Sequence, residues 1–546
     1  MNIEIKNYKI EIETGMYLDT DVYIPQCHRK LPSILFRTPY EKSNVYALFD
    51  PITVVKKGFV LVVQDVRGRF LSDGIFQPFE NEKSDSAKTI DWILEQSWSN
   101  ERIYTIGISY EGLCAILAIE TGKISGFSPI VSSLEIRNDW FYENNCLKQA
   151  FVQSWSHSFA FTDNGNLVDK CTIDTVQQLS NNMMNLYEEP LEEFPINAIL
   201  PYYQYWIQNK NNDYWGKIHN ATTCAQYNVP GFFVTGWYDI FCESTIRLYK
   251  KFCEKSNCSQ HLVIGPWCHM ELFNSVVGEI DYGIYTLEKF SPYVIVDWFK
   301  SLENGKKICS QVTVYIMGIN KWVSLNKKTD VNYKKIYLQS YGNANSVLGK
   351  GRLAYTMGVS SGVDTFMGYK NEIVRSNGGR CIDAIPEGKG GPYNQENLEK
   401  STNTLVYTSD VFEKMEIILG EVQVKLTCRA SIKSADYCIK LTAVSPNGIS
   451  INLLDSCLRI FDVADKIETH TVSLGHIAYA ILPGYRIRCD IFANNFPRLD
   501  IVKDMKEKDC KLEIFWGRLY ESCIILPFLE NSMEILESKG SWWRSI

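Results

Sequence analysis

Apolar and polar positions in the first third of the chain follow the periods of strands and helices in turn. Two continuous apolar runs, residues 33–37 and 58–65, are typical of central strands that are buried on both faces. Residues 85–96 carry apolar side chains at helical spacing, and a strand at 102–108 leads directly into a helix at 110–120. This order of strands and helices predicts a mostly parallel sheet with helices on both faces.

The pattern changes near residue 135. Residues 137–221 are rich in aromatic side chains and Asn, contain long helical candidates and show no alternating strand, which predicts a helical cap inserted into the core. The strand and helix pattern then resumes, with strands expected at 231–235 and 261–264 and helices at 244–255 and 293–303. We therefore expect one α/β core made of residues 1–136 and 222–330.

Beyond residue 330 the helical pattern nearly vanishes. Short β-rich runs at 405–407, 420–427, 438–444 and 486–492 are separated by Gly, Pro, Asn and Asp. This spacing predicts an all-β sandwich or jelly roll over residues 331–546.

Composition narrows the class of protein. The net charge of −7 is mild for 546 residues, and no basic patch of the kind that nucleic-acid binding requires is present. The first fifteen residues alternate like a strand instead of forming a signal peptide, and no apolar stretch reaches the ~20 residues of a membrane helix. The 17 cysteines are odd in number and lack a C-x-x-C pair, which fits reduced thiols. We expect a cytoplasmic protein that binds neither nucleic acid nor membrane.

The segment from Arg102 to Gly112 contains the first candidate catalytic residue, Ser109. An apolar strand runs into Gly107-Ile-Ser109 and a helix starts at once, so the serine hydroxyl would stand exposed above the sheet. The usual pattern is G-x-S-x-G, whereas here the second glycine comes three residues after the serine, with Glu111 between them. Taken alone, the motif fits a loop serine equally well.

Two later strand ends supply partners for Ser109. Hydrolases of the α/β type carry nucleophile, acid and base in that order along the chain, each at the end of a strand. The apolar strand that starts at residue 231 ends in Asp239, and the one that starts at residue 261 ends in His269. Among the seven histidines, His269 alone has this place and order. The arrangement predicts Ser109 as nucleophile, His269 as base and Asp239 as the acid that orients it.

These residue types fit acyl transfer. A serine hydroxyl needs a base to become a nucleophile, and imidazole titrates near neutral pH. The backbone N–H of Tyr110, directly after the nucleophile, is the expected first donor of the oxyanion hole. No H-E-x-x-H or similar metal motif is present, so we expect neither a metal nor another cofactor.

A set of short stretches lies in order along nearly the whole chain. They are Arg37-Thr-Pro-Tyr40, Gln64-Asp-Val-Arg-Gly68, Ser72-Asp-Gly74, Gly107-Ile-Ser-Tyr-Glu-Gly112, Gly236-Trp-Tyr-Asp239, Gly265-Pro-Trp-Cys-His269, Met317-Gly318, Leu482-Pro-Gly484 and Asn494-Asn-Phe-Pro497. In these stretches the chain resembles the cocaine-esterase/X-prolyl dipeptidyl-peptidase (S15) group of serine hydrolases. The elbow of that group also places its second glycine three residues after the serine.

The resemblance implies an α/β-hydrolase core, an inserted helical cap and a C-terminal jelly roll. It also implies that the Tyr40 hydroxyl is the second oxyanion donor and that aromatic side chains line the acyl pocket, although cap aromatics also serve as plain core. The aromatic candidates are Trp140, Trp155, Trp237 and Phe241. Glu243 and Glu271 are candidate carboxylates for a substrate's free amine, with solvated surface acids as the alternative. A homodimer is the assembly that the resemblance suggests.

Several functions stay open at this point. The main hypothesis is a serine hydrolase that cleaves a small-molecule ester or amide through an acyl-serine intermediate. An acyltransferase would use the same residues, and an X-Pro dipeptidyl or α-amino-acyl peptidase belongs to the same group. Prolyl peptidases of the group are usually longer at the N-terminus, which favours an esterase or acylase for a chain that starts at the core. A hydrolase fold without activity, used for binding, is the alternative from another class.

Overall fold

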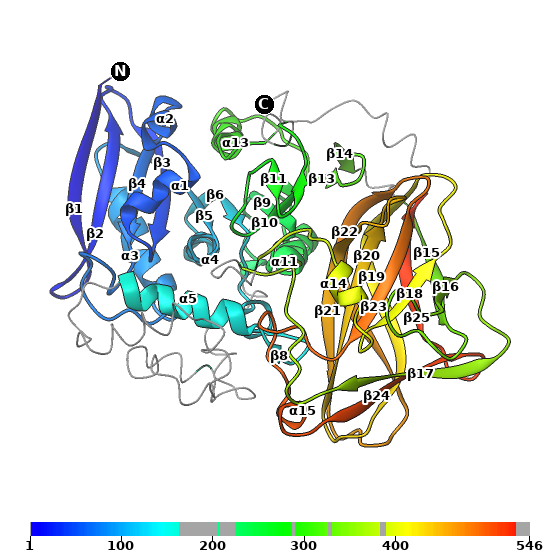
Figure 1. The fold of residues 1–546 in the computed structure, drawn as a ribbon. Coiled ribbons are helices and arrows are strands. Elements are labelled where there is room, and N and C mark those ends of the chain that lie inside the picture. Colours follow the sequence, from blue (N-terminus) through cyan, green and yellow to red (C-terminus); the bar gives the residue numbers. More distant parts are fainter. Residues whose placement is uncertain are drawn as a thin grey trace.

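A ten-stranded mixed sheet forms the centre of the first domain (Figure 1). Its six inner pairings, from β4 to β13, are parallel, and antiparallel strands complete both edges. In sheet order the strands are β1 (Ile3–Glu13), β2 (Met16–Pro25), β4 (Val60–Asp65), β3 (Leu31–Thr38), β5 (Ser99–Ile108), β6 (Ile124–Ile130), β9 (Gly231–Tyr238), β10 (Gln260–Cys268), β13 (Gln311–Ile316) and β14 (Lys321–Leu325).

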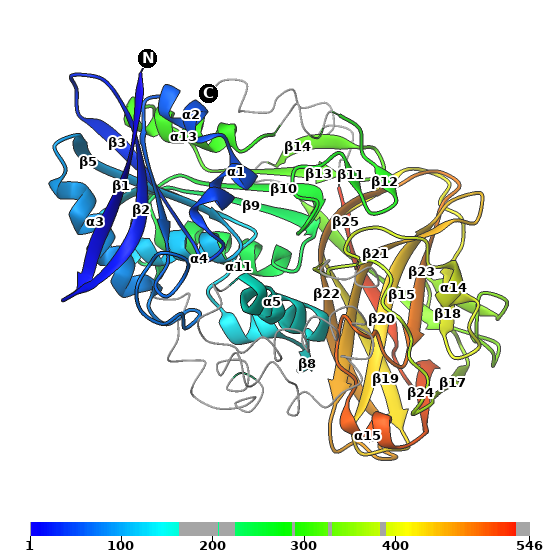
Figure 2. The same cartoon turned by 60° about the vertical axis from the view of Figure 1, so that its left-hand side comes forward.

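The computed structural model describes residues 2–162, 206, 224–284, 286, 290–325, 330–382 and 389–530. Strands β3, β4, β9 and β10 are buried along their whole lengths, which explains their continuous apolar runs. Helices cover both faces of the sheet, with α2 and α13 on one side and α3, α4 and α11 on the other (Figure 2). The helices are α1 (Val45–Leu48), α2 (Pro51–Lys56), α3 (Glu82–Glu95), α4 (Tyr110–Leu117), α11 (Cys242–Lys255) and α13 (Tyr293–Glu303).

The predicted cap begins directly after β6. Its described part holds a π-helical turn (Ile136–Phe141), the small hairpin β7 (Tyr142–Glu143) and β8 (Cys146–Leu147), and helix α5 (Gln149–Thr162). The remainder of the predicted cap, apart from Trp206, lies outside the described residues. Between β10 and α13 a second small hairpin, β11 (Val276–Val277) and β12 (Ile280–Asp281), follows the predicted base.

The C-terminal domain is all-β except for two short helices, α14 (Glu396–Glu399) and α15 (Lys503–Glu507), in its described ranges. Its eleven strands pair antiparallel apart from β16 with β18. The strands are β15 (Val331–Gln339), β16 (Gly351–Ala354), β17 (Ser361–Gly368), β18 (Leu405–Ser409), β19 (Glu416–Ala430), β20 (Ala435–Val444), β21 (Ser450–Ile460), β22 (Glu468–Ile481), β23 (Arg486–Phe492), β24 (Cys510–Gly517) and β25 (Cys523–Leu529). The predicted α/β core followed by an all-β domain is confirmed, and jelly-roll connectivity stays a prediction.

The two domains are joined by backbone pairing as well as by packing. After β13 the backbone of Met317 exchanges hydrogen bonds with Ala478 and Ala480 of β22, at 3.1 and 2.8 Å. One continuous cluster of buried apolar side chains runs from the core into the β domain. The β domain therefore lies against the edge of the core at which the predicted acid and base strands end.

Candidate active site

Ser109 occupies a tight turn between β5 and α4. Its backbone has φ 56° and ψ −117°, a conformation that residues with a side chain rarely adopt. The Ser109 N–H donates to the carbonyl of Ile130 at 2.8 Å, and the Ser109 carbonyl accepts from the Ser132 hydroxyl at 2.6 Å. Both bonds reach the end of the neighbouring strand β6, so the serine is fixed in the geometry of a nucleophile elbow.

Two glycines make this turn possible. A Cβ at Gly107 would stand 2.3 Å from the carbonyl group of Glu111, and a Cβ at Gly112 would stand 2.8 Å from the Cβ of Ser132. The first glycine lets α4 close onto the end of β5, and the second lets it pack against the segment after β6. A glycine three residues after the serine is therefore what this packing requires.

Asp239 and His269 form a hydrogen-bonded pair at the ends of β9 and β10. Oδ2 of Asp239 lies 2.7 Å from Nδ1 of His269, and Oδ1 accepts from the Phe241 N–H at 2.6 Å. Asp239 is fully buried. Since both carboxylate oxygens accept, Nδ1 carries the proton of neutral His269, and Nε2 is left as the proton acceptor.

Sheet order brings the three residues to one edge. Strands β5, β6, β9 and β10 are consecutive and parallel, so their carboxyl ends lie together (Figure 2). Within the described part of the chain the Ser109 hydroxyl makes no hydrogen bond. Such bonds are often long in a free enzyme and tighten when substrate binds. The arrangement can support nucleophilic attack by Ser109 with His269 as base.

Tyr40 follows β3 and faces the same edge. Its hydroxyl oxygen accepts from the indole N–H of Trp155 at 2.9 Å, and its ring stacks on Phe159 with centroids 5.7 Å apart. Burial raises the pKa of the Tyr40 hydroxyl above its ordinary value, so the group stays protonated and can donate. The backbone N–H of Tyr110, at the first position of α4, has no acceptor within the helix. These are the two donors that the sequence predicted for an oxyanion.

Glu111 is a site residue to which the sequence analysis gave no role. Its Oε1 accepts from the Thr38 hydroxyl and from the Asn44 side-chain amide, both at 2.7 Å, and Oε2 accepts weakly from the Ile108 N–H at 3.4 Å. The Thr38 hydroxyl in turn accepts from the Tyr40 N–H at 3.1 Å. Burial raises the pKa of Glu111 to about 7, although these donors act to lower it. Glu111 thus ties the Tyr40 segment to the nucleophile elbow.

Three of the four predicted pocket aromatics lie together. Trp140 packs against Phe241 and Trp155, with centroids 4.6 and 5.6 Å apart, and Phe241 meets the His269 ring edge-on at 5.6 Å. Sequence reasoning missed further rings of this cluster, although three of them lie on the π-helical turn or on α5 beside the predicted tryptophans. The further rings are Phe79, Phe141, Phe151, Phe159 and Trp206.

Trp237 does not join this cluster. It is buried in β9, and its indole N–H donates to the carbonyl of Tyr315 in β13 at 2.7 Å. Trp237 therefore lies in the packing of the sheet, away from these rings. Glu271 uses one oxygen for structure, because its Oε2 accepts from the Gly278 N–H at 2.8 Å and closes the turn after His269, and its predicted amine-binding role stays a prediction.

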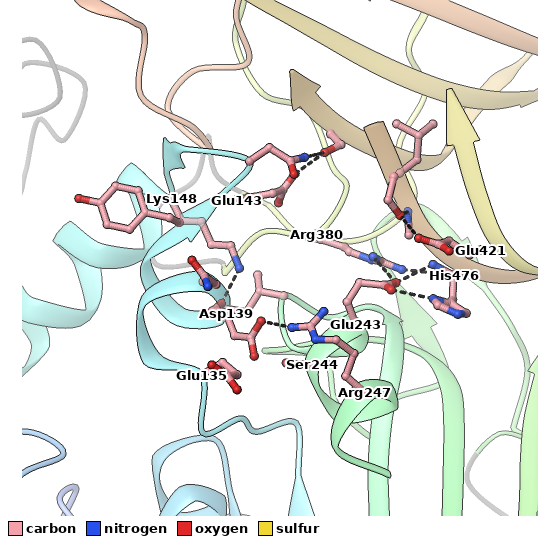
Figure 3. Close-up of a pocket in the computed structure, with 18 of the residues that line it drawn as sticks. Glu135, Asp139, Glu143, Lys148, Glu243, Ser244, Arg247, Arg380, Glu421 and His476 are labelled. Atoms are coloured by element: carbon pink, nitrogen blue, oxygen red, sulfur yellow. Dashed lines mark hydrogen bonds and ion pairs between the residues drawn. The ribbon is translucent and has the colours of Figure 1, made fainter. Parts of the chain in front are cut away.

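Glu243 does not offer an open carboxylate either. It lines a cavity of about 690 Å³ between α11, the π-helical turn and the β domain, a cavity that neither Ser109 nor His269 lines (Figure 3). Oε1 lies 2.8 Å from Arg380 Nη1, and Oε2 lies 2.7 Å from His476 Nδ1. Burial acts to raise the pKa of Glu243, but these two groups hold it well below its usual range. Both carboxylate oxygens of Glu243 are therefore engaged in this structure, and its predicted amine-binding role stays a prediction.

In the described ranges one group of three side chains has the spacing of metal ligands. Cys146, Asp436 and Cys457 lie within 4.8 Å of one another, but Arg459 donates to both oxygens of Asp436, at 2.7 and 2.8 Å. This cluster lies in the β domain and the hairpin β7–β8, apart from Ser109. Among the described residues no helix is both long and apolar enough to cross a membrane.

Two family models together match most of the chain. The model of the X-Pro dipeptidyl-peptidase (S15) family matches residues 14–271, and that of the X-Pro dipeptidyl-peptidase C-terminal non-catalytic domain matches residues 304–521. The chain belongs to the X-Pro dipeptidyl-peptidase (S15) family. A cocaine esterase from Rhodococcus sp. (strain MB1 Bresler) is 25% identical, over 96% of this chain and 98% of the esterase.

Solved structures of similar fold include other hydrolases. An aminopeptidase from a marine sediment archaeon, Thaumarchaeota archaeon, has a TM-score of 0.80 at 19% identity and covers 97% of both chains. An α-amino acid ester hydrolase has a TM-score of 0.79 at 18% identity and covers 96% of both chains. The S15 family model spans Ser109, Asp239 and His269, and the non-catalytic model falls largely on the all-β domain. The predicted family and hydrolase class are confirmed, whereas the roles of individual residues stay predictions.

Proposed function

We propose that this S15 serine hydrolase cleaves a small carboxylic ester through an acyl-enzyme on Ser109. The observation that carries the proposal is the 2.7 Å pair of Asp239 and His269, held at the sheet edge where the strained Ser109 turn ends β5. A base with a fixed tautomer at the same sheet edge as the serine is the arrangement that nucleophilic acyl transfer requires.

Acylation begins with attack of Ser109 Oγ on the ester carbonyl carbon. Nε2 of His269 takes the hydroxyl proton, while Asp239 stabilises the imidazolium through Nδ1. The carbonyl oxygen becomes an oxyanion and accepts from the Tyr40 hydroxyl and the Tyr110 N–H, each worth about 2.7–4 kcal/mol by analogy with other oxyanion donors. The bond to the leaving oxygen then breaks, and His269 returns its proton to the departing alcohol.

Deacylation repeats these steps with water. His269 takes a proton from the water, whose oxygen attacks the acyl carbon, and Ser109 leaves with a proton from the imidazolium. An amine in place of the water would give an amide, so an acyltransferase would need no further residue. The partition of product between free acid and amide separates the two activities.

The engaged carboxylates favour an ester without a free amine. Both oxygens of Glu243 are bound, by Arg380 and His476, so this carboxylate is not open to a substrate ammonium; a backbone N–H binds one oxygen of Glu271. Recognition of an α-amine by X-Pro or α-amino-acyl peptidases requires such an acceptor. The buried rings around Trp140 instead favour an apolar acyl group.

The test is a hydrolysis panel on purified protein with Ser109→Ala as control. It pairs short and medium p-nitrophenyl esters with dipeptidyl-proline anilides and free-amino-acyl esters. We expect turnover of simple esters that the Ser109→Ala variant loses. Preference for free α-amines would replace this proposal with the peptidase alternative. If Ser109 also fails to react with a fluorophosphonate probe, the chain is a binding protein instead of an enzyme.

The proposed division of the chain is a core of residues 1–136 and 222–330, a cap of residues 137–221 and a β domain of residues 331–546. The proposed substrate is a small molecule, without a nucleic-acid or membrane partner. Cytoplasmic location and a homodimer stay predictions from the sequence.

A further inference from the structure

Arg380 makes three hydrogen bonds at the interface between the domains, and two of them cross it. It belongs to the segment after β17 and is 8% exposed. Its Nε donates to the carbonyl of Trp237 at 3.0 Å, Nη1 to Oε1 of Glu243 at 2.8 Å, and Nη2 to the carbonyl of His476 at 2.7 Å. One guanidinium thus joins the end of β9, the start of α11 and strand β22. Figure 3 shows Arg380 beside Glu243 and His476.

Two of these contacts enclose the predicted catalytic acid. Trp237 comes two residues before Asp239, and Glu243 four residues after it. The turn between them makes its own hydrogen bonds, from Asp239 N to Gly236 O at 3.0 Å and from Cys242 N to Asp239 O at 3.1 Å. Arg380 therefore fixes both ends of a short turn whose centre is Asp239.

His476 anchors this contact in the β domain. Its N–H donates to Oε1 of Glu243 at 2.6 Å, and its Nδ1 lies 2.7 Å from Oε2. The bulge in β22 brings Gly475 against the same groups, because a Cβ there would stand 2.1 Å from Arg380 Nη1 and 2.6 Å from Glu243 Oε1. Because Gly475 has no side chain, β22 leaves room for the contact between Arg380 and Glu243 at this position.

We propose that Arg380 is a positioning residue that holds the Asp239 turn, so that the β domain sets the orientation of the catalytic pair. The inference rests on the proposed function, since it takes Asp239 to orient His269. A displacement of about 1 Å at a catalytic group lowers the rate by about 10²-fold. Lysine cannot replace Arg380, because a single ammonium cannot reach three acceptors spread over the guanidinium fork.

A matched control exists in the same cavity. Glu143 in β7 also crosses to the β domain, with Oε2 2.7 Å from Arg498 Nη2 and Oε1 2.8 Å from the Ser456 hydroxyl. It lines the same cavity as Glu243, but among the described residues no hydrogen bond of its side chain reaches the Asp239 turn. Glu143→Gln and Glu243→Gln therefore weaken the same interface by the same chemical change.

The experiment compares Arg380→Lys, Glu243→Gln and Glu143→Gln in the full-length enzyme. It measures kcat, KM and Tm with the ester that the wild type turns over best. We expect kcat to fall about 10²-fold in Arg380→Lys and about tenfold in Glu243→Gln, with KM within about twofold of wild type. Glu143→Gln is expected to keep kcat even where its Tm falls as far as that of Glu243→Gln.

Two results would overturn the proposal. One is wild-type kcat in Arg380→Lys, which would show that the turn holds Asp239 unaided. The other is an equal loss of kcat in Glu243→Gln and Glu143→Gln that follows the loss of Tm. That result would show that Arg380 only holds the two domains together and does not position Asp239. Failure of the proposed function has a different signature, because Ser109→Ala would then match the wild type whatever the Arg380 variants do.

Discussion

Replacing Asp239 by Asn is expected to stop the base from accepting a proton. Oδ1 of Asp239 accepts from the Phe241 N–H, so the amide oxygen of the substituted side chain would take that place. The new NH₂ group would then face Nδ1 of His269, where Oδ2 now lies at 2.7 Å, and would donate to it. His269 would carry its proton on Nε2 and could not receive the Ser109 proton. The same change in a Ser-His-Asp protease lowers kcat about 10⁴-fold, or roughly 5.4 kcal/mol of barrier.

The assay is steady-state hydrolysis of a p-nitrophenyl ester by wild type and Asp239→Asn, with Tm as a check on folding. Asp364→Asn supplies the matched control, since Asp364 is a buried carboxylate of β17, in the β domain, that bonds Ser340 and Tyr407. We expect Asp364→Asn to lower Tm without lowering kcat. Activity of Asp239→Asn within tenfold of wild type, in folded protein, would refute the tautomer argument.

Three further predictions test other parts of the site. Tyr40→Phe removes the proposed hydroxyl donor, so kcat should fall about 10²- to 10³-fold with KM little changed; an unchanged kcat would leave Tyr110 as the main donor. The pKa of Glu111 is raised from 4.5 to about 7, so the folded state binds this proton more tightly than the unfolded state. That contribution to stability is complete below pH 4.5 and is lost as pH rises through 7, by up to about 3 kcal/mol, and urea unfolding of Glu111→Gln should lack this loss. Dialysis against a chelator should leave the rate of ester hydrolysis unchanged, because the proposed steps use side chains and backbone N–H groups alone. A loss of activity that added zinc restores would contradict this expectation.

Elements with a strong local signal were predictable from the sequence. Helix α13 and strand β23 have the predicted bounds, 293–303 and 486–492, because apolar periodicity and turn residues define both ends. Strand β6 was missed because its sequence, ISGFSPI, contains Gly and Pro, which disfavour a strand until neighbours on both sides bury it. Strand β13 and the edge strand β14 beside it were missed as well.

Some residues of the candidate site could be predicted from local sequence pattern, and others could not. Ser109, Asp239 and His269 could be predicted because each follows an apolar strand, so local pattern and chain order suffice. The surroundings of Glu243 could not, because Arg380 lies 137 residues and His476 lies 233 residues further along the chain. Contacts of that separation depend on how two domains dock, which periodicity does not encode.

That separation has a consequence for synthesis of the enzyme on the ribosome. Glu243 emerges 233 residues before His476, an interval of roughly ten to fifty seconds at ordinary rates of translation. The core sheet can form in that interval, but its last edge has no β22 to pair with Met317, and Arg380 has no β22 carbonyl to bind. The nascent chain therefore carries its nucleophile long before the acid turn acquires its support. Catalytic competence is among the last properties that the growing chain acquires.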